Sequence, residues 1–232
     1  MNNIEYEILK RARLAVLGCK LEGIVHNLNS PLNTILGYAQ ILQNKYPQNN
    51  KLEKIYQAGL KIDNEFKNLA DFINKFKSNK VFFLNLNNEI IEHLKIMNFH
   101  LFYKHHIDTA TIFDENLPKL RISYADLHLL LDNLIANAIE AMEKEEEKKM
   151  QVETRYKNNN IHLLIKNIGS LPSDPEIVFN PKYTNHKNRK LGLGLPLCLY
   201  ILKSYNGKIQ LKTNNNYTTA EIIFPIKVAD EK

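Results

Sequence analysis

The chain has 232 residues, of which 44% are hydrophobic and 24% charged, and its formal net charge at pH 7 is +6. This composition is typical of a folded protein and excludes an intrinsically disordered chain. The positive charge favours an acidic or phosphate-bearing partner, whereas no basic run is long enough to indicate nucleic acid.

No apolar run approaches the roughly 20 residues that cross a bilayer, and the N-terminus lacks the layout of a signal peptide. We therefore expect a cytoplasmic chain without a membrane segment, whose sensory input comes from a separate sensor protein or an upstream segment. Cys19 and Cys198 lie far apart and match no metal-binding spacing, so we expect two reduced, mostly buried thiols.

Residues 1–79 predict two long helices joined by a polar turn at 45–50. Apolar or small residues recur in steps of three and four, which is the spacing of a heptad stripe. A single hairpin would leave this stripe in water, so we expect two copies to pair into a four-helix bundle, as a homodimer. The stripe consists of Leu14, Leu17, Leu21, Ile24, Leu28, Leu32, Ile35, Ala39 and Leu42 before the turn, and Leu52, Ile55, Gly59, Ile62, Phe66, Leu69, Ile73 and Phe76 after it.

A histidine in the first helix stands close to a proline. His26 is two residues from both Ile24 and Leu28, so it is expected to point away from the apolar stripe. Pro31 follows five residues later, where its ring removes one helical hydrogen bond and kinks or loosens the helix. By position alone, His26 is an ordinary histidine on a helix surface.

From residue 80 onward, strands and helices are mixed. The spacing predicts a helix over 123–145, with Ser123 as its N-cap and Asp126 in its first turn. The order of elements predicts an α+β sandwich whose sheet is covered on one face, with a domain boundary near 77–81. The other expected elements are a strand at 81–87, a helix at 88–105, a strand at 106–113, a hairpin at 150–167, a helix at 193–207 and a hairpin at 208–226.

Four motifs follow one another along the chain: GIVHNLNSPLNTILGYAQIL at 23–42, NLIANAIEA at 133–141, NPKYTNHK at 180–187 and GLGL at 192–195. They resemble the phosphoacceptor, asparagine, Phe-Tyr-Thr and second glycine boxes of sensor-type histidine protein kinases, in that family's order. The resemblance implies a HisKA-like dimerisation and phosphoacceptor hairpin over 1–79, which is all-α. It also implies a catalytic ATP-binding domain of GHKL type over 80–232.

The activity that this resemblance implies is ATP-dependent autophosphorylation on His26, followed by phosphotransfer to an aspartate of a response-regulator receiver domain in two-component signalling. The regulator is expected to dock along the lower part of the hairpin bundle. Two alternatives stay open. One is a catalytically weak phosphotransfer or scaffold protein with a degenerate nucleotide site, and the other is a GHKL clamp ATPase that needs Glu140 and not His26.

Asn133 and Asn137 lie four residues apart and share one helix face, and amide oxygens suit Mg²⁺ that bridges phosphates. The resemblance implies that Asn137 is the Mg²⁺ ligand and that Asn133 lies near the phosphates. For Glu140 two roles stay open, since it either assists proton transfer or is only a surface acid. Gly192 and Gly194 would admit phosphate to the N-terminus of the next helix. The full set of implied nucleotide contacts is Asn133, Asn137, Glu140, Asn167, Gly169, Tyr183, Thr184, Lys187, Gly192, Leu193, Gly194 and Leu195, beneath a lid that contains Lys182, Arg189 and Lys190.

The chain departs from the family pattern at three positions. Asn167 stands where the family has the Asp that accepts a hydrogen bond from adenine, and Lys182 stands where the lid has Phe. Asn27 follows His26, where the family has an acid that serves as base; an amide cannot take a proton, so we expect slow phosphotransfer or another base. Ser30 matches the position of a Thr or Asn that aligns water for phosphatase action, and it equally fits an ordinary surface serine.

Overall fold

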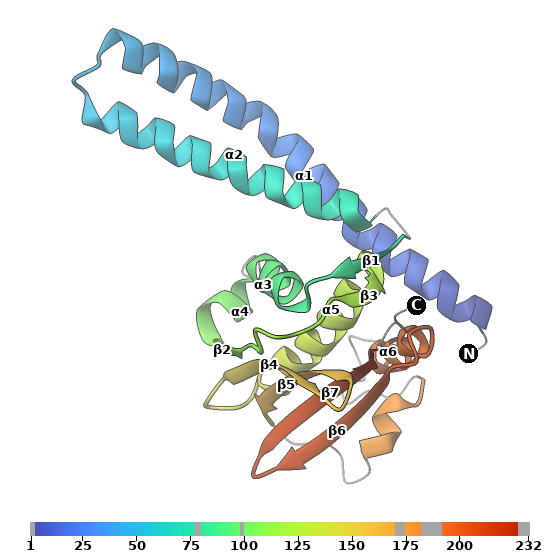
Figure 1. Cartoon of the computed structure of the whole chain (residues 1–232). Coiled ribbons are helices and arrows are strands. Elements are labelled where there is room, and N and C mark those ends of the chain that lie inside the picture. The colour runs from blue at the N-terminus through green and yellow to red at the C-terminus, as the bar shows by residue number, and fades with distance from the viewer. Residues whose placement is uncertain (1–2, 77–79, 98–99, 170–174, 182–191, 227–232) are drawn as a thin grey trace. The chain divides into compact units, whose positions relative to one another are not determined.

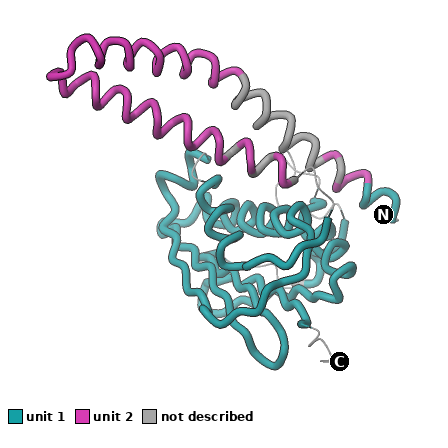
Figure 2. Tube along the Cα trace, turned by 45° about the horizontal axis from the view of Figure 1, so that its top comes forward, with its two compact units in different colours: residues 1–7, 80–232 teal, residues 8–79 magenta. Residues whose placement is uncertain are grey.

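The computed structural model describes residues 3–76, 80–97, 100–169, 175–181 and 192–226; for residues 11, 13–26, 69, 72, 73, 76 and 175 it describes the backbone only. The chain divides into two compact units, which Figure 2 distinguishes by colour. One unit comprises residues 8–79, and the other comprises residues 1–7 together with 80–232.

The helical unit is a pair of long helices, α1 (Asn3–Lys45) and α2 (Asn50–Phe76), joined by a tight turn (Figure 1). The Asn49 side chain accepts a hydrogen bond from the backbone of Lys51 (3.1 Å), and thereby caps the start of α2. The predicted turn is confirmed. Helix α1 continues through Pro31.

The contact between α1 and α2 depends on a glycine. Gly59 of α2 is buried, and a Cβ added to it would lie only 2.7 Å from Cδ2 of Leu36. Leu32 and Ala39 of α1 are buried in the same unit, and Gln43 donates a hydrogen bond to Glu53 across the helix pair. Leu32, Ala39 and Gly59 are therefore the buried members of the predicted apolar stripe among the side chains that are described. Other members are exposed in the single chain, including Ile35 (53%), Ile55 (49%) and Ile62 (46%).

The second unit contains a five-stranded mixed sheet in the order β2-β4-β5-β7-β6 and a separate two-stranded antiparallel sheet, β1-β3. Strand β2 is parallel to β4, and the remaining pairs of the large sheet are antiparallel. This architecture confirms the predicted α+β ATP-binding fold. The strands are β1 (Val81–Leu84), β2 (Asp108–Ile112), β3 (Leu120–Ser123), β4 (Lys149–Lys157), β5 (Asn160–Ile168), β6 (Lys208–Asn214) and β7 (Tyr217–Pro225).

The helices of this unit are α3 (Leu86–Met97), α4 (Leu101–His106), α5 (Tyr124–Ala141), the short 3-10 helix η1 (Pro175–Phe179) and α6 (Gly194–Lys203). Helix α5 contacts β5, and α6 contacts β6 and α5. Side chains on β4, β5 and β7 alternate between buried and more exposed, because one face of the sheet packs on the helices and the other does not. The inner face consists of Met150, Val152, Thr154, Ile161, Leu163, Ile165, Ala220, Ile222 and Phe224.

The structure corrects the predicted elements at several points. The strand at 81–87 stops at Leu84, because the Asn85 side chain caps α3 by accepting from the backbone of Asn88 (3.1 Å). The helix at 88–105 is two helices, α3 and α4, and the helix at 193–207 ends at Lys203. Strand β3 was not predicted, because it has only four residues and pairs with a strand 40 positions earlier.

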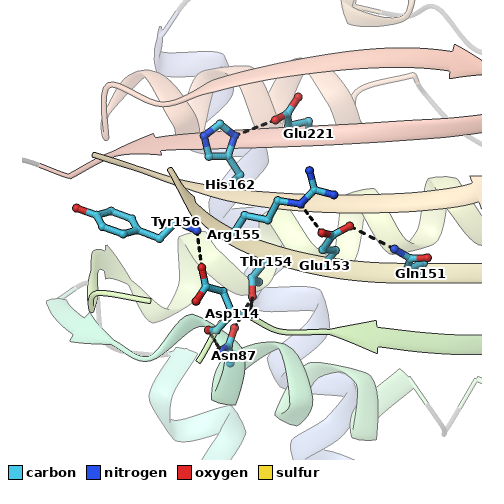
Figure 3. A network of polar contacts seen from close by, with 9 residues as sticks. All are labelled: Asn87, Asp114, Gln151, Glu153, Thr154, Arg155, Tyr156, His162 and Glu221. Carbon is cyan, nitrogen blue, oxygen red and sulfur yellow. Dashed lines mark hydrogen bonds and ion pairs between the residues drawn. The ribbon is translucent and has the colours of Figure 1, made fainter. Parts of the chain in front are cut away.

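A polar network fastens the loop after β2 to β4 and α3 (Figure 3). The Thr154 hydroxyl donates to Oδ1 of Asn87 (2.8 Å) and accepts from the backbone of Asp114 (3.1 Å). The Asp114 carboxylate accepts backbone hydrogen bonds from Tyr156 and Asn116, which lower its pKa.

Within the described part of the chain, no helix has the length and apolar character to cross a membrane.

Two glycines in the hairpin are predicted to respond oppositely to alanine. Gly59→Ala should destabilise the helical unit by about 1–3 kcal/mol, because its methyl group overlaps Leu36. Gly37→Ala should stabilise it by about 0.5–1 kcal/mol, because Gly37 has nothing within 4 Å and alanine favours helix. Urea unfolding followed by far-ultraviolet circular dichroism measures both changes. Stabilisation by both substitutions would contradict the close contact at Gly59.

Candidate functional site

Helix α5, which carries the two predicted asparagines, is held firmly at its start. The Ser123 hydroxyl accepts from the backbone of Asp126 (3.1 Å), which confirms the predicted N-cap. The Tyr205 hydroxyl donates to Oδ2 of Asp126 (2.6 Å) and accepts from the backbone of Ser123 (3.1 Å). Burial, reinforced by Asp126, raises the pKa of Tyr205, so this hydroxyl remains a donor. The segment after α6 is thereby tied to the first turn of α5.

The two asparagines of α5 have different surroundings. Asn133 is 5% exposed, and its Nδ2 donates to the backbone oxygen of Leu129 (2.7 Å). Asn137 is half-buried, and its amide makes no hydrogen bond to any of the described residues. Glu140, one turn further along, is also half-buried. The Asn137 amide is therefore the more available of the two for a ligand.

The end of β5 supplies a second part of the site. Asn167 is buried, and its Nδ2 donates to the backbone oxygen of Ile168 (2.7 Å), which leaves Oδ1 as the acceptor that the side chain presents. Gly169 has a φ of +125°, which only glycine adopts readily. A Cβ at Gly169 would lie 3.2 Å from the backbone oxygen of Ala141, so the end of β5 abuts the end of α5.

Thr218 on β7 belongs to this part of the site and was missed by sequence reasoning. Its buried hydroxyl donates to the backbone oxygen of Gly169 (2.7 Å), and it pairs with Asn167 across the β5–β7 ladder. The backbone N–H of Gly169 also donates to Asn216 (2.9 Å). Alternation along β7 could have identified Thr218 as a polar residue on the buried face, but only strand pairing reveals its partner.

The start of α6 supplies the third part. Gly192 has a φ of +62°, and no side chain of the described residues caps the helix at Leu193. The first N–H groups of a helix have no intrahelical acceptor, so the amides of Gly194 and Leu195 are available to an anion. Pro196 follows in the first turn, where its lack of an N–H costs little. A Cβ at Gly194 would lie 3.0 Å from Oδ1 of Asn133, so α6 begins against α5.

The end of β5 and the start of α6 thus both lie against α5, at Ala141 and at Asn133, respectively. The Asn137 and Asn167 amides and the first amides of α6 are the groups here that can bind a ligand. Three predicted contacts, Tyr183, Thr184 and Lys187, lie outside the described residues, as do the lid residues Lys182, Arg189 and Lys190.

The predicted phosphoacceptor region lies in the helical unit. His26 is within α1, but its side chain is outside the described residues, and Asn27 and Ser30 are exposed. Asn29, Ser30, Asn33 and Thr34 line a shallow groove on α1. Across the described ranges, no three His, Cys, Asp or Glu side chains gather as metal ligands. The Cys198 thiol is reduced and buried, as predicted, whereas the Cys19 side chain is among those that are not described.

A buried polar cluster links α5 to α3. Nδ1 of His93 lies 3.0 Å from Nδ1 of His128, and Nε2 of His128 lies 3.1 Å from Oε2 of Glu89. Two ring nitrogens at this distance share one proton, so both rings cannot be charged while the contact persists. Burial, followed by the nearby His128, lowers the pKa of His93 well below its ordinary value.

Comparison with known proteins gives a consistent result. Residues 122–225 match the family model of the GHKL domain. The chain is 22% identical over 232 residues to Sporulation kinase C of Bacillus subtilis (strain 168), which covers 93% of this chain and 50% of that protein. It is 22% identical over 236 residues to the sensory histidine kinase/phosphatase NtrB of Vibrio alginolyticus, which covers 96% of this chain and 66% of that protein. Across eight curated relatives, the chain spans between 23% and 66% of the length of the relative.

A solved structure agrees with these relatives. The catalytic domain of histidine kinase ThkA superposes with a TM-score of 0.57 at 25% identity, covering 63% of this chain and 95% of that chain. The resemblance to sensor-type histidine kinases, inferred from the four motifs, is confirmed.

The lowered pKa of His93 predicts acid sensitivity of the second unit. Below about pH 6.5 the unfolded chain binds a proton at this histidine that the folded protein does not, so the free energy of unfolding should fall as the pH falls. In His93→Phe the unfolded chain should take up one proton fewer, so the slope of the unfolding free energy against pH should decrease by up to about 1.4 kcal/mol per pH unit. Urea unfolding between about pH 7 and pH 5 measures the slope. His105→Gln, at an exposed position on α4, should keep the wild-type slope; an unchanged slope in His93→Phe would contradict the assignment.

Proposed function

From its relationship to sensor histidine kinases, in a chain whose residues 122–225 form a GHKL domain, we propose that this protein is an ATP-dependent histidine protein kinase. It phosphorylates itself on His26 and passes the phosphoryl group to an aspartate of a response-regulator receiver domain. The observation that carries the proposal is the convergence of Asn137, the Asn167–Gly169 corner and the uncapped start of α6 around α5. These groups supply what a nucleoside triphosphate needs: an acceptor for the base, an oxygen donor and free amides for phosphate.

Adenine is bound at the end of β5. The exocyclic amine of adenine is a donor, and Oδ1 of Asn167 is an acceptor because the amide nitrogen is held by Ile168. Asn167 thus presents to the base the same kind of atom as the aspartate that the family has at this position. Thr218 holds the carbonyl of Gly169 and with it the turn next to the base.

The phosphates lie between α5 and α6. The amides of Gly194 and Leu195 favour negative charge at the start of α6. Asn137 fits a Mg²⁺ ion, because its half-buried amide oxygen is a neutral, hard ligand without a partner among the described residues. When bound, Mg²⁺ neutralises charge on the β- and γ-phosphates. Glu140 lies one turn along and is placed to hold a water molecule near Asn137.

The chemistry at His26 is an in-line displacement. A neutral ring nitrogen of His26 forms a bond to the γ-phosphorus, the bond to the β,γ-bridging oxygen breaks, and ADP leaves with that oxygen. The proton on the other ring nitrogen must then be released. Asn27, next in the chain and exposed, can orient the ring by accepting a hydrogen bond but cannot take the proton.

Hydrolysis of the aspartyl phosphate is a second activity of the same helix. The exposed hydroxyl of Ser30 faces the groove formed with Asn29, Asn33 and Thr34, and Thr34 donates to the backbone oxygen of Ser30 (3.1 Å). A serine hydroxyl can align a water molecule for attack on the phosphoryl group. Ser30 is therefore proposed as the residue that supports phosphatase action.

The working form is a homodimer. Ile35, Ile55 and Ile62 are about half exposed in the single chain, although the sequence puts them on the apolar stripe. Leaving such residues in water forgoes about 25 cal/mol for each Å² that a partner would bury. Pairing two hairpins into a four-helix bundle covers them.

Incubation with γ-labelled Mg-ATP tests the activity. Wild type should acquire an acid-labile, base-stable label, and His26→Ala should acquire none. Asn137→Ala should slow labelling by about a hundredfold or more, as expected when one group that stabilises transition-state charge is removed. The matched control His105→Ala should be labelled like wild type. An unlabelled wild type that binds ATP would favour the clamp ATPase, and one that binds no ATP would favour the phosphotransfer scaffold.

Restoring a base beside His26 should accelerate the reaction. Asn27→Glu is expected to raise the rate of autophosphorylation by roughly a hundredfold, the lower end of the range that general-base catalysis contributes. Gln40→Glu adds the same charge at another exposed position of α1, outside the groove at Ser30, and should leave the rate unchanged. Equal rates for wild type and Asn27→Glu, measured by the same labelling, would contradict the proposal that Asn27 causes slow phosphotransfer.

A further inference from the structure

Gly194 differs from the other glycines of the site. Gly169 and Gly192 have φ values of +125° and +62°, where glycine is favoured whatever surrounds it. Gly194 lies in the first turn of α6 and is not among the glycines of positive φ. Its backbone therefore does not require glycine.

Glycine is required at position 194 because of the neighbouring side chain of Asn133. A Cβ added to Gly194 would lie 3.0 Å from Oδ1, 3.7 Å from Cγ and 3.9 Å from Cβ of Asn133, and these are its three nearest neighbours. The Asn133 amide cannot swing aside cheaply, because it is buried and its Nδ2 is bonded to the carbonyl of Leu129 at 2.7 Å. Alanine at Gly194 would thus push α6 away from α5 by a few tenths of an ångström.

We infer that Asn133 is a positioning residue, which sets the distance between α5 and the first turn of α6, and that Asn137 alone of the two asparagines faces the ligand. This differs from the expectation that Asn133 itself approaches the phosphates. The consequence for nucleotide binding rests on the proposed function, in which the amides of Gly194 and Leu195 hold phosphate. A small displacement of these amides lengthens every hydrogen bond that they make.

The contact makes a specific prediction for a pair of substitutions. Asn133→Ala removes Oδ1 and Cγ, so the methyl group of a Gly194→Ala variant would meet only Cβ at 3.9 Å, an ordinary contact. Gly194→Ala should therefore be harmful in the wild-type background and mild in the Asn133→Ala background. Such coupling is what a double-mutant cycle measures.

The experiment compares wild type, the two single variants and the double variant by calorimetric titration with Mg-ATP and by urea unfolding without nucleotide. Gly194→Ala should weaken ATP binding by roughly tenfold and lower the unfolding midpoint, as overpacking does. In the Asn133→Ala background the same substitution should weaken binding by less than about threefold and should no longer lower the midpoint. Gly192→Ala is the matched control, because its strain comes from its φ and should persist in both backgrounds.

Two results would overturn the inference: an equal cost of Gly194→Ala in both backgrounds, or loss of ATP binding in Asn133→Ala as severe as in Asn137→Ala. Failure of the proposed nucleotide site gives a different result, since wild type would then bind no ATP. The coupling in urea unfolding would still test the contact between Asn133 and Gly194.

Discussion

The structure of the second unit depends on the burial of helix α5. Most side chains of this helix are buried, so each polar one needs a partner or a ligand. Asp126 accepts from Tyr205, His128 contacts His93 and Glu89, and Asn133 bonds to Leu129. Asn137 makes no such bond to the described residues, and it lies where β5 and α6 approach the helix. Asp126, His128 and Asn133 thus hold the fold together, whereas Asn137 has no partner among the described residues and is the proposed ligand of Mg²⁺.

The structure of the second unit depends equally on two glycines that bring the backbone of other elements close to α5. Gly169 and Gly194 come within contact distance of Ala141 and Asn133, respectively, and neither position has room for a side chain without displacement. The two glycines have different reasons to be glycine. Gly169 has a left-handed φ as well as a close neighbour, whereas Gly194 has only the neighbour. The glycines around α5 therefore combine a conformational requirement with a steric one.

The two asparagines that replace acidic residues have unequal chemical consequences. An amide keeps the acceptor oxygen of a carboxylate but loses the ability to take a proton. In the proposed adenine site only the acceptor of Asn167 is needed, and the bond to Ile168 orients it. At Asn27, beside the proposed phosphoacceptor His26, proton transfer is the part that is missing. In the proposed function, the amide at position 167 is therefore compatible with nucleotide binding, whereas the amide at position 27 limits the rate of phosphotransfer.

The sequence by itself determined the hairpin at the N-terminus, most of the elements and the α+β character of the second unit, and the cap at Ser123. These follow from local periodicity, from turn residues and from capping chemistry, which act over a few positions. Four ordered motifs also sufficed to indicate the family. Helical spacing puts Asn133 and Asn137 on one face and does not show that Asn133 is bonded within α5 while Asn137 is not. Nor did the sequence identify β3 or Thr218, whose partners lie far away in the chain. Only the tertiary structure decided these points, because they depend on which groups from other elements meet α5, and local spacing carries no record of that.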